Sequence, residues 1–133
     1  RRDIRTVGDR FVFQSEVLFG SGASDIAAAG KKELAQLART LNSIAPNIPK
    51  KINWILQIEG HTDHIPISNR RFQNNWELSA ARAISVVEFL IGQGVPADRL
   101  SAAGYGEFQP LDKRRDEIGN RRNRRIEMKF TQR

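Results

Sequence analysis

The sequence predicts an α+β fold, a two-layer α/β sandwich in which one mixed four-stranded sheet carries its helices on one face. Two apolar stretches, 27–45 and 80–91, repeat at the spacing of three to four residues that is typical of helices. Residues 52–59 and 125–131 instead alternate between apolar and polar side chains, as strands do. The resulting order, β-α-β-α-β-(α)-β, favours a single mixed sheet that is covered on one side.

We expect one domain at residues 10–133, preceded by a polar lead-in at residues 1–9. The chain has 133 residues, of which 39% are hydrophobic and 28% charged, a composition typical of a folded globular domain. It begins at Arg1 without Met, so we expect the lead-in to come from a longer parent protein. The sequence has no apolar run long enough to span a bilayer, and it has no cysteine for disulfides or thiolate chemistry.

The first strand and the first helix are predicted from residue type and spacing. β-Branched and aromatic side chains at 10–13 and 17–19 indicate one kinked strand or two short ones. A helix follows, and Pro46 and Pro49 end it. The buried stripe of this helix is predicted to consist of Ala27, Gly30, Leu34, Leu37, Ala38, Leu41 and Ala45.

The next strand and the second helix follow. Residues 52–59 alternate, and Ile55 makes their second face partly apolar, so we expect a central strand. The helix begins at Asn74 or Asn75, which are both natural N-caps. Trp76, near its start, is either a hydrophobic staple or a platform for a sugar ring. The predicted core face consists of Ala80, Ala83, Ile84, Val87, Leu90 and Ile91.

Two further strands complete the predicted sheet. Residues 99–104 form a short strand of small side chains, and a turn follows at 104–107. A long charged connection with a short helix leads to the last strand, 125–131. In this strand Ile126, Met128 and Phe130 are predicted to point inward, and Arg125, Glu127 and Lys129 toward solvent.

One carboxylate and one guanidinium are brought to the same end of this fold. Asp63 follows the central strand, and Arg82 is placed on the second helix, opposite its predicted core face. A carboxylate holds an ammonium group, and a guanidinium holds a carboxylate through two parallel bonds. The pair therefore suits a zwitterion, such as the free amino-acid end of a larger molecule. The alternative is an Asp63–Arg82 ion pair that only ties the loop to the helix.

Five short motifs, in one order, carry a resemblance to a known family. With these motifs at this spacing, the sequence resembles the OmpA C-terminal-like peptidoglycan-binding domain, and its Asn-Trp-Glu form looks most like the MotB branch. The resemblance covers roughly residues 10–130. The motifs are Phe-Gly-Ser-Gly-Ala at 19–23, Gly-His-Thr-Asp at 60–63, Asn-Trp-Glu-Leu-Ser-Ala-Ala-Arg-Ala at 75–83, Gly-Tyr-Gly-Glu at 104–107 and Asn-Arg-Arg-Ile-Glu at 123–127.

The resemblance implies a binding function and no enzymatic activity. It implies non-covalent binding of peptidoglycan through the meso-diaminopimelate of the stem peptide. Asp63 is then expected to take the ligand's ammonium, and Arg82 the adjacent carboxylate. Thr62, Asn75 and Leu78 are expected to complete the pocket, while His61, Asn123 and Arg124 support it from behind. No cofactor is expected.

The resemblance also implies a place in the cell. The expected location is the periplasm of a Gram-negative bacterium, with the parent protein anchored in the inner or outer membrane. The family's usual sequence before Asn123 is replaced at Arg114–Asn120, so that wall of the pocket stays unpredicted. This change motivates an alternative function, a structural or oligomerisation module with lost or weakened wall binding. A homodimer is compatible with wall binding and with the alternative.

Three other chemistries find less support. His61, Asp63 and His64 suggest a metal, but the group lacks a third histidine, a cysteine and helical spacing. Ser79 has no glycine-flanked elbow, which argues against a catalytic triad. Lys113–Arg125 holds seven basic residues against two acidic ones, +5 of the net charge of +7. This segment is a solvated basic face or contacts an anionic partner; without stacking aromatics, nucleic acid is not expected.

Overall fold

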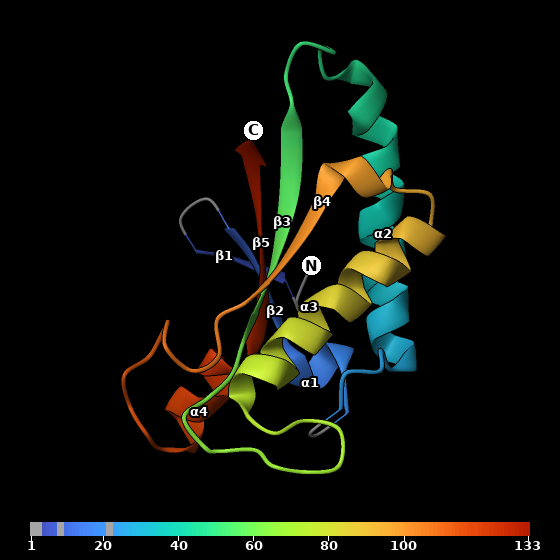
Figure 1. Ribbon diagram of the computed structural model, residues 1–133. Coiled ribbons are helices and arrows are strands. Elements are labelled where there is room, and N and C mark those ends of the chain that lie inside the picture. Colours follow the sequence, from blue (N-terminus) through green and yellow to red (C-terminus); the bar gives the residue numbers. More distant parts are fainter. Residues whose placement is uncertain (1–3, 8–9, 21–22) are drawn as a thin grey trace.

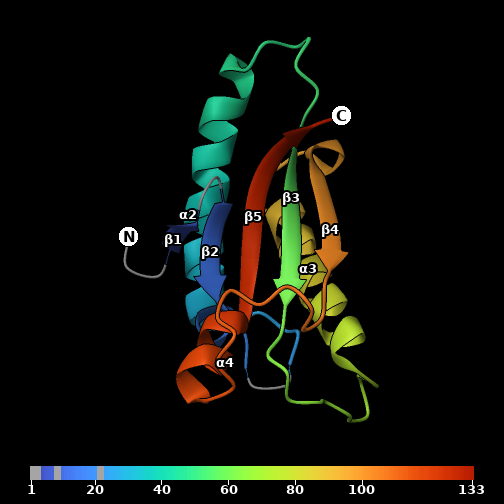
Figure 2. The ribbon, with the colours of Figure 1, turned by 90° about the vertical axis from the view of Figure 1, so that its left-hand side faces the viewer.

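The protein is built around one twisted sheet with two long helices on one face. The computed structural model describes residues 4–7, 10–20 and 23–133. Five strands pair in the order β1-β2-β5-β3-β4, with β3 and β4 parallel and the other neighbours antiparallel. Figure 2 shows this sheet in front of α2 and α3, so the predicted fold class is confirmed. The bounds are β1 Ile4–Val7, β2 Arg10–Gln14, β3 Trp54–His61, β4 Leu100–Gly104, β5 Arg125–Gln132, α2 Ala28–Ile44 and α3 Asn75–Gly92 (Figure 1).

The sheet has one edge strand more than the four that were predicted. β1 lies within the predicted lead-in and pairs antiparallel with β2, with Ile4 opposite Phe13 and Val7 opposite Arg10. Four residues are too few to show a clear alternation of side chains, so this strand could not be read from the sequence. β3 pairs with both β4 and β5 and is central, as predicted.

The chain turns sharply after β2 instead of continuing as a strand. Ser15–Leu18 form one helical turn, α1, in which the Phe19 amide donates to the Ser15 carbonyl at 2.8 Å. The Ser15 amide donates to the Arg124 carbonyl at 2.9 Å. The strand predicted at 17–19 was therefore wrong. A backbone contact with a distant part of the chain sets this conformation, and it overrides the strand preference of the residues.

α2 and α3 supply the helical half of the core. α2 buries Gly30, Leu34, Ala38 and Leu41 from the predicted stripe, whereas Ala27 is exposed just before the helix. A short 3₁₀ turn, η1 (Ala45–Asn47), follows α2 and contains Pro46. α3 begins after Asn74, whose side chain accepts a bond from the Glu77 amide at 3.0 Å. The fully buried core includes Phe13, Leu18, Leu34, Leu56, Ile58, Val86, Leu90, Ile126 and Met128.

The buried face of α3 matches the predicted one only in part. Ala83 and Leu90 are buried as predicted, whereas Ile84 and Ile91 are 48% and 41% exposed. The prediction was wrong for these two residues because α3 carries apolar residues on two faces, and only packing decides which of them is covered. Arg82 consequently lies on the buried face and not opposite to it. The buried residues of α3 are Asn75, Leu78, Ser79, Arg82, Ala83, Val86 and Leu90.

Two glycines bring α3 close to the sheet. Gly60 in β3 and Gly104 in β4 lie opposite each other in the parallel ladder. A Cβ at Gly60 would overlap the backbone carbonyl of Ser79, and a Cβ at Gly104 would overlap the backbone of Ala80. Any larger residue would push the helix outward. These two glycines therefore fix the depth of the first turns of α3, where Arg82 is found.

Part of the sheet face that lies away from the helices is buried. Arg125 and Glu127 were predicted to point to solvent, but they are 2% and 3% exposed. The prediction was wrong because both belong to a paired cluster with Arg10 and Glu59. Phe130, predicted to point inward, is mostly outside the core near the end of β5. In the described part of the chain, every helix is too short or too polar to cross a lipid bilayer.

Candidate ligand-binding pocket

A pocket of about 600 Å³ lies at the end of the sheet where β3 stops and α3 begins. Its walls come from α1, from the loop after β3, from the first half of α3 and from Arg124, which directly follows α4 (Glu117–Asn123). All five residues that were predicted to contact a ligand line it. They are Thr62, Asp63, Asn75, Leu78 and Arg82. The fold thus brings them together, while their contact with a ligand stays a prediction.

Asp63 is held in place by two other groups of the protein. Its Oδ1 accepts a hydrogen bond from the Ile65 amide at 3.0 Å, which closes a tight turn after β3. Its Oδ2 accepts a bond from Nη1 of Arg124 at 2.8 Å. The alternative that Asp63 pairs with Arg82 is therefore contradicted, since Arg82 directs its bonds elsewhere.

Arg82 is buried and has no carboxylate partner among the described residues. It is 5% exposed, and its guanidinium lies 4.9 Å from the centre of the Phe19 ring. Its Nε donates to the Ala23 carbonyl at 2.7 Å, and Nη2 donates to the Gly20 carbonyl at 3.1 Å. Burial lowers the pKa of Arg82 to about 10, although Glu16 and Asp63 act in the opposite direction. The group is still charged at neutral pH.

Thr62, Asn75 and Leu78 shape the pocket in different ways. Thr62 is fixed through its backbone, because its amide donates to the Gly106 carbonyl at 2.9 Å. The Asn75 side chain donates to the Ile65 carbonyl at 3.0 Å and so holds the loop after β3 against α3. Leu78 is buried and supplies an apolar wall. These residues order the loop that carries Asp63.

Arg124 lines the pocket, although it was predicted to support the pocket from behind. Its guanidinium binds three carboxylates, those of Asp63 at 2.8 Å, Glu16 at 2.7 Å and Glu117 at 2.9 Å. Burial tends to lower the pKa of Arg124, but the hydrogen bonds that it donates to Glu16, Asp63 and Glu117 outweigh burial and raise the pKa. One arginine thereby ties together α1, the loop after β3 and α4.

The sequence analysis missed Ser15 and Glu16 as pocket residues. Both lie in α1 and line the pocket. The segment had been assigned to a break within a strand, so neither residue could be placed at the end of the sheet. A buried turn that positions a carboxylate depends on contacts that are far apart in the sequence, and no local pattern indicates it.

His61 and Asn123 do not line this pocket. His61 lies on the opposite face of the sheet, where its Nε2 is 3.3 Å from Oε1 of Glu59 and its ring stacks on Tyr105. The Asn123 side chain accepts bonds from the Leu111 and Asp112 amides, both at 2.9 Å. Asn123 therefore braces the connection between β4 and α4, and its support of the pocket stays a prediction.

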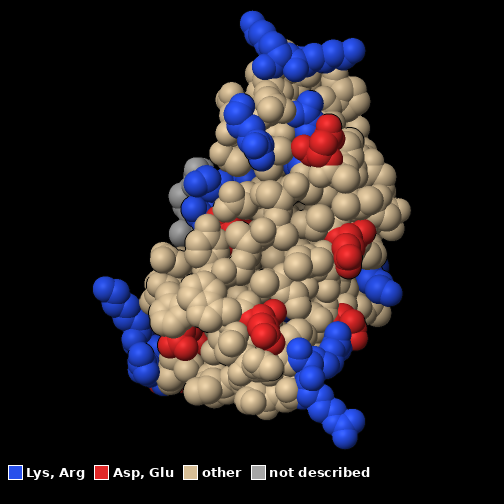
Figure 3. All heavy atoms as spheres, viewed as in Figure 1, with Lys and Arg blue, Asp and Glu red and all other residues tan. Residues whose placement is uncertain are grey.

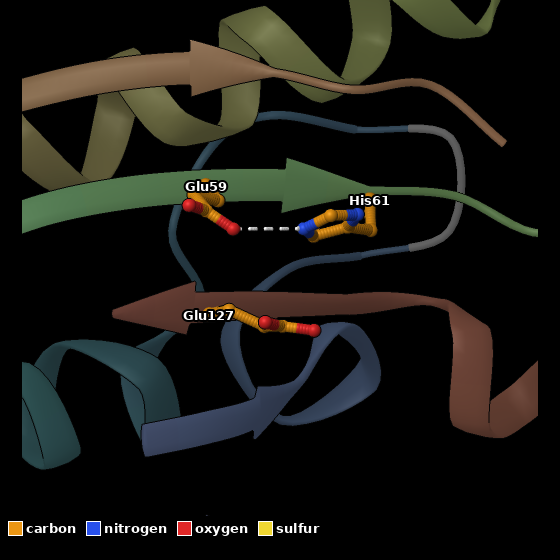
Figure 4. A group of neighbouring side chains, drawn as sticks. All are labelled: Glu59, His61 and Glu127. Carbon is orange, nitrogen blue, oxygen red and sulfur yellow. Dashed lines mark hydrogen bonds and ion pairs between the residues drawn. The ribbon is translucent and has the colours of Figure 1, made fainter. Parts of the chain in front are cut away.

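The charged cluster behind β3, on the sheet face away from the helices, has the composition of a metal site. Figure 4 shows the side chains of Glu59, His61 and Glu127 converging from β3 and β5, with their donor atoms within 4.8 Å of one another. Arg10 binds both carboxylates, and Arg125 binds Glu127 as well. Each negative charge is thus already matched by an arginine. The cluster acts as an ion-pair network within the fold.

The other candidate chemistries are not assembled by the fold. His64 is placed with its Nδ1 2.9 Å from the Asn120 side chain, away from the charged cluster that contains His61. The Ser79 hydroxyl donates to the Trp76 carbonyl and accepts from the Gly106 amide at 3.0 Å. These bonds join α3 to the turn after β4. They do not activate the Ser79 hydroxyl as a nucleophile.

The basic segment Lys113–Arg125 divides into two parts. Arg124 lines the pocket and Arg125 is buried, while the five other basic side chains are exposed. Asp112 pairs with Arg114 and Arg122, and these ion pairs hold the pKa of Asp112 below its usual value. Figure 3 shows Lys and Arg side chains projecting at the end of the molecule where α4 lies and also at the opposite end.

Trp76 forms an exposed aromatic pair. It is 52% exposed and stacks on Phe108 with 5.2 Å between the ring centres. Phe108 follows the turn after β4, so the pair joins that turn to the first turn of α3. Phe108 is thus the ring that packs on Trp76 within the chain, while stacking of Trp76 on a sugar ring stays a prediction.

A family model and curated proteins both match this chain over most of its length. Residues 18–124 match the family model described as OmpA family. The chain is 37% identical over 117 residues to Motility protein B of Bacillus subtilis, an alignment that covers 86% of this chain and 42% of that protein. The chain spans less than half the length of the first curated relatives that it matches.

Solved structures share the whole fold. A MotB-like protein from Desulfovibrio vulgaris superposes with a TM-score of 0.86 and 32% identity, over 98% of this chain and 79% of that chain. A structure described as the cell wall anchor of the T6SS from Pseudomonas aeruginosa gives 0.79 and 27%, over 97% and 85% of the respective chains.

Proposed function

We propose that this chain, which belongs to the OmpA family, binds peptidoglycan non-covalently and anchors its parent protein to the cell wall. The ligand group that we propose is the meso-diaminopimelate of the stem peptide, whose free end carries an ammonium and a carboxylate. The likeness to a structure described as a cell wall anchor supports the proposal. The proposed place of action is the periplasm, with the parent protein attached to the inner or outer membrane, and no catalytic step is involved.

The observation that carries the proposal is the unpaired guanidinium of Arg82. A buried charge is costly unless an opposite charge compensates it. Nε and Nη2 of Arg82 bind backbone carbonyls, whereas Nη1 makes no hydrogen bond within the described residues. A ligand carboxylate that enters the pocket would supply the missing negative charge and the missing acceptor. Arg82 is positioned for this role because its backbone contacts already fix its orientation.

Asp63 offers the complementary charge in the same pocket. One of its oxygens binds Arg124 and the other the Ile65 amide. Each carboxylate oxygen has the lone pairs to accept a second hydrogen bond, so an ammonium group can bind beside Arg124. A pocket with one held carboxylate and one unpaired guanidinium matches a zwitterion better than a simple anion or cation.

The direct test is co-sedimentation with insoluble Gram-negative sacculi. We expect the wild-type chain to sediment, and Arg82→Ala and Asp63→Asn to stay in solution. Loss of one partner of such a charged contact costs on the order of 2–5 kcal/mol, which is enough to abolish weak binding. Arg71→Ala is the matched control, because the Arg71 side chain is exposed, contacts Asp25, Ser24 and the Phe72 ring, and lies outside the pocket lining.

Folding of the variants is checked before binding is compared. Arg82→Lys keeps the positive charge but not the planar donor group, and should bind weakly while unfolding at nearly the wild-type temperature. Equal sedimentation of Arg82→Ala, Asp63→Asn and the wild type, with all three folded, would refute the proposal.

Self-association is a second candidate function, favoured by the exposed apolar residues of α3. Ile84 and Ile91 lie on one side of this helix, outside the core. In an oligomerisation module these residues would meet another copy of the chain. Sedimentation velocity over a hundredfold concentration range tests this idea. Concentration-dependent dimers that are lost in Ile84→Glu, together with no sacculus binding, would favour it over wall anchoring.

A further inference from the structure

The hydroxyl of Ser15 is buried in the pocket wall without a partner. Ser15 is 3% exposed and lines the pocket, and its Oγ makes no hydrogen bond with any residue that the structure describes. The Ser15 backbone is held at both ends, because its amide donates to the Arg124 carbonyl and its carbonyl accepts from the Phe19 amide. The backbone that carries the hydroxyl is therefore fixed in position. A buried polar group without a partner is unfavourable, and a polar ligand atom in the pocket would remove that penalty.

Glu16, the next residue, presents a carboxylate to the same pocket. Its Oε2 accepts two bonds from Arg124, at 3.1 Å from Nε and 2.7 Å from Nη2. Asp63 binds Nη1 of the same guanidinium. The two carboxylates thus lie on neighbouring edges of one planar group. Oε1 of Glu16 has no hydrogen-bond partner among the residues that the structure describes.

The balance of charge leaves room for a second cation. Arg124 is shared by three carboxylates, those of Glu16, Asp63 and Glu117. Arg82 brings a second positive charge to the pocket, but two positive charges still do not compensate three negative ones, so the carboxylates attract a further cation. An ammonium group brings three N–H donors, and the α1 side of the pocket offers three kinds of acceptor. These acceptors are the Asp63 carboxylate, Oε1 of Glu16 and Oγ of Ser15.

We infer that Ser15 and Glu16 form a second ligand-contacting wall of this pocket and select for a primary ammonium. The inference rests on the proposed function, because it concerns the ammonium end of the same ligand. Asp63 supplies one acceptor and Ser15–Glu16 supply the others, while Arg82 holds the carboxylate. A ligand that carries an uncharged amide in place of the ammonium would leave Glu16 without its partner.

A purely structural role of Glu16 makes a different prediction. Glu16 could act only by holding Arg124 in place. Glu117 also binds Arg124, at 2.9 Å, but it lies on α4 and is not part of the pocket lining. Glu117→Gln therefore removes another carboxylate bond to Arg124, one where Glu16 makes two, without touching the proposed ligand wall. It is the matched control for Glu16→Gln.

The test is isothermal titration calorimetry with two synthetic stem peptides. Both contain meso-diaminopimelate, and in the second peptide its side-chain amine is acetylated. We expect the wild type to prefer the free amine, and Glu16→Gln to bind the free amine about tenfold more weakly, the order expected for loss of a hydrogen bond to a charged group. Its affinity for the acetylated peptide should change little, so the preference ratio falls. Ser15→Ala should lower the ratio in the same direction.

The outcomes separate this inference from the proposed function. If the wild type binds and Glu16→Gln keeps the wild-type preference ratio, or only matches the effect of Glu117→Gln, the inference is wrong and the proposed function stands. If the folded wild type binds neither peptide, the proposed function fails and the inference fails with it. A fall in the ratio for Glu16→Gln and Ser15→Ala, with Glu117→Gln unchanged, supports the inference.

Discussion

Asp63 forms an ion pair of 2.8 Å with Arg124, whereas Arg82 in the same pocket donates its hydrogen bonds, within the described part of the chain, to backbone carbonyls and lies over the ring of Phe19. The two charges that suit a zwitterion are thus held separately and do not cancel each other. A pocket whose charges were already paired with each other would first have to break that pair on binding. Here the ligand carboxylate would meet a guanidinium that is fixed and free of any carboxylate.

Removal of Arg124 should destabilise the fold. In Arg124→Gln the carboxylates of Glu16, Asp63 and Glu117 lose their shared cation. The side chain is partly exposed, so we expect a loss below the 3–5 kcal/mol seen for fully buried pairs, about 1–3 kcal/mol of unfolding free energy in urea. Arg114→Gln, which breaks an exposed pair with Asp112, should change it much less. Equal losses in the two variants would contradict the assigned role of Arg124.

The close approach of α3 to the sheet predicts a strong effect of two small substitutions. Gly60→Ala and Gly104→Ala each place a Cβ against the backbone of α3. We expect each to lower the unfolding free energy by about 1–3 kcal/mol, the usual cost of overpacking. Gly92→Ala is the control, because a Cβ there meets nothing within 4 Å and alanine favours helix. It should be neutral or stabilising, and equal destabilisation of all three would argue against the close contact.

The buried ion-pair network behind β3 should behave as a coupled unit. Glu127→Met leaves Arg125 buried without its carboxylate, and we expect a loss of about 3–5 kcal/mol of unfolding free energy. Arg125→Met should be similarly harmful. The double variant should be more stable than either single one, because no uncompensated charge remains. Additive losses in this double-mutant cycle, measured by urea unfolding, would show that the two residues act independently.

Acid should weaken the same network through Glu59. Burial alone would raise the pKa of Glu59, but its hydrogen bond with His61 and the charge of Arg10 outweigh burial and lower the pKa below 4.5. Because the folded state then binds fewer protons than the unfolded state, this stabilisation is present above pH 4.5 and is lost as the pH falls through the lower folded value. The stability difference between wild type and Glu59→Gln should shrink below about pH 4.5. A constant difference from pH 7 to 3 would contradict this pKa shift.

The exposed basic residues near α4 should make wall binding sensitive to salt. Peptidoglycan stem peptides carry carboxylates, and attraction to exposed charges falls as ionic strength rises. We expect the variant Lys113→Gln/Arg115→Gln/Arg121→Gln to bind sacculi more weakly at low salt and to show a shallower salt dependence than the wild type. The control variant, Arg39→Gln/Lys50→Gln/Lys51→Gln, loses the same charge far from α4 (Figure 1). Identical salt curves for the two variants would assign the effect to net charge alone.

Local patterns identified most of the secondary structure and several pocket residues. The alternation of Trp54, Leu56 and Ile58 indicated a central strand, and the Asn74 cap marked the start of α3. Ser15–Leu18 could not be predicted, because its turn depends on a bond to the Arg124 carbonyl more than a hundred residues later in the chain. The polar face of β5 was misread for the same reason. Arg125 and Glu127 are buried by partners from other strands.

The sequence by itself determined that Asp63 and Arg82 meet at the end of the sheet. The end of one apolar strand, one helix cap and short motifs at fixed spacing suffice to bring Asp63 and Arg82 to one pocket, because strand and helix periods are local properties. Only the tertiary structure decided which charge pairs with which, and which face of α3 is buried. Asp63 and Arg124 are 61 residues apart, and their pairing depends on how three elements pack. The identity of a charged residue does not indicate which opposite charge it will meet. Its partner is decided by distance and burial in the folded chain.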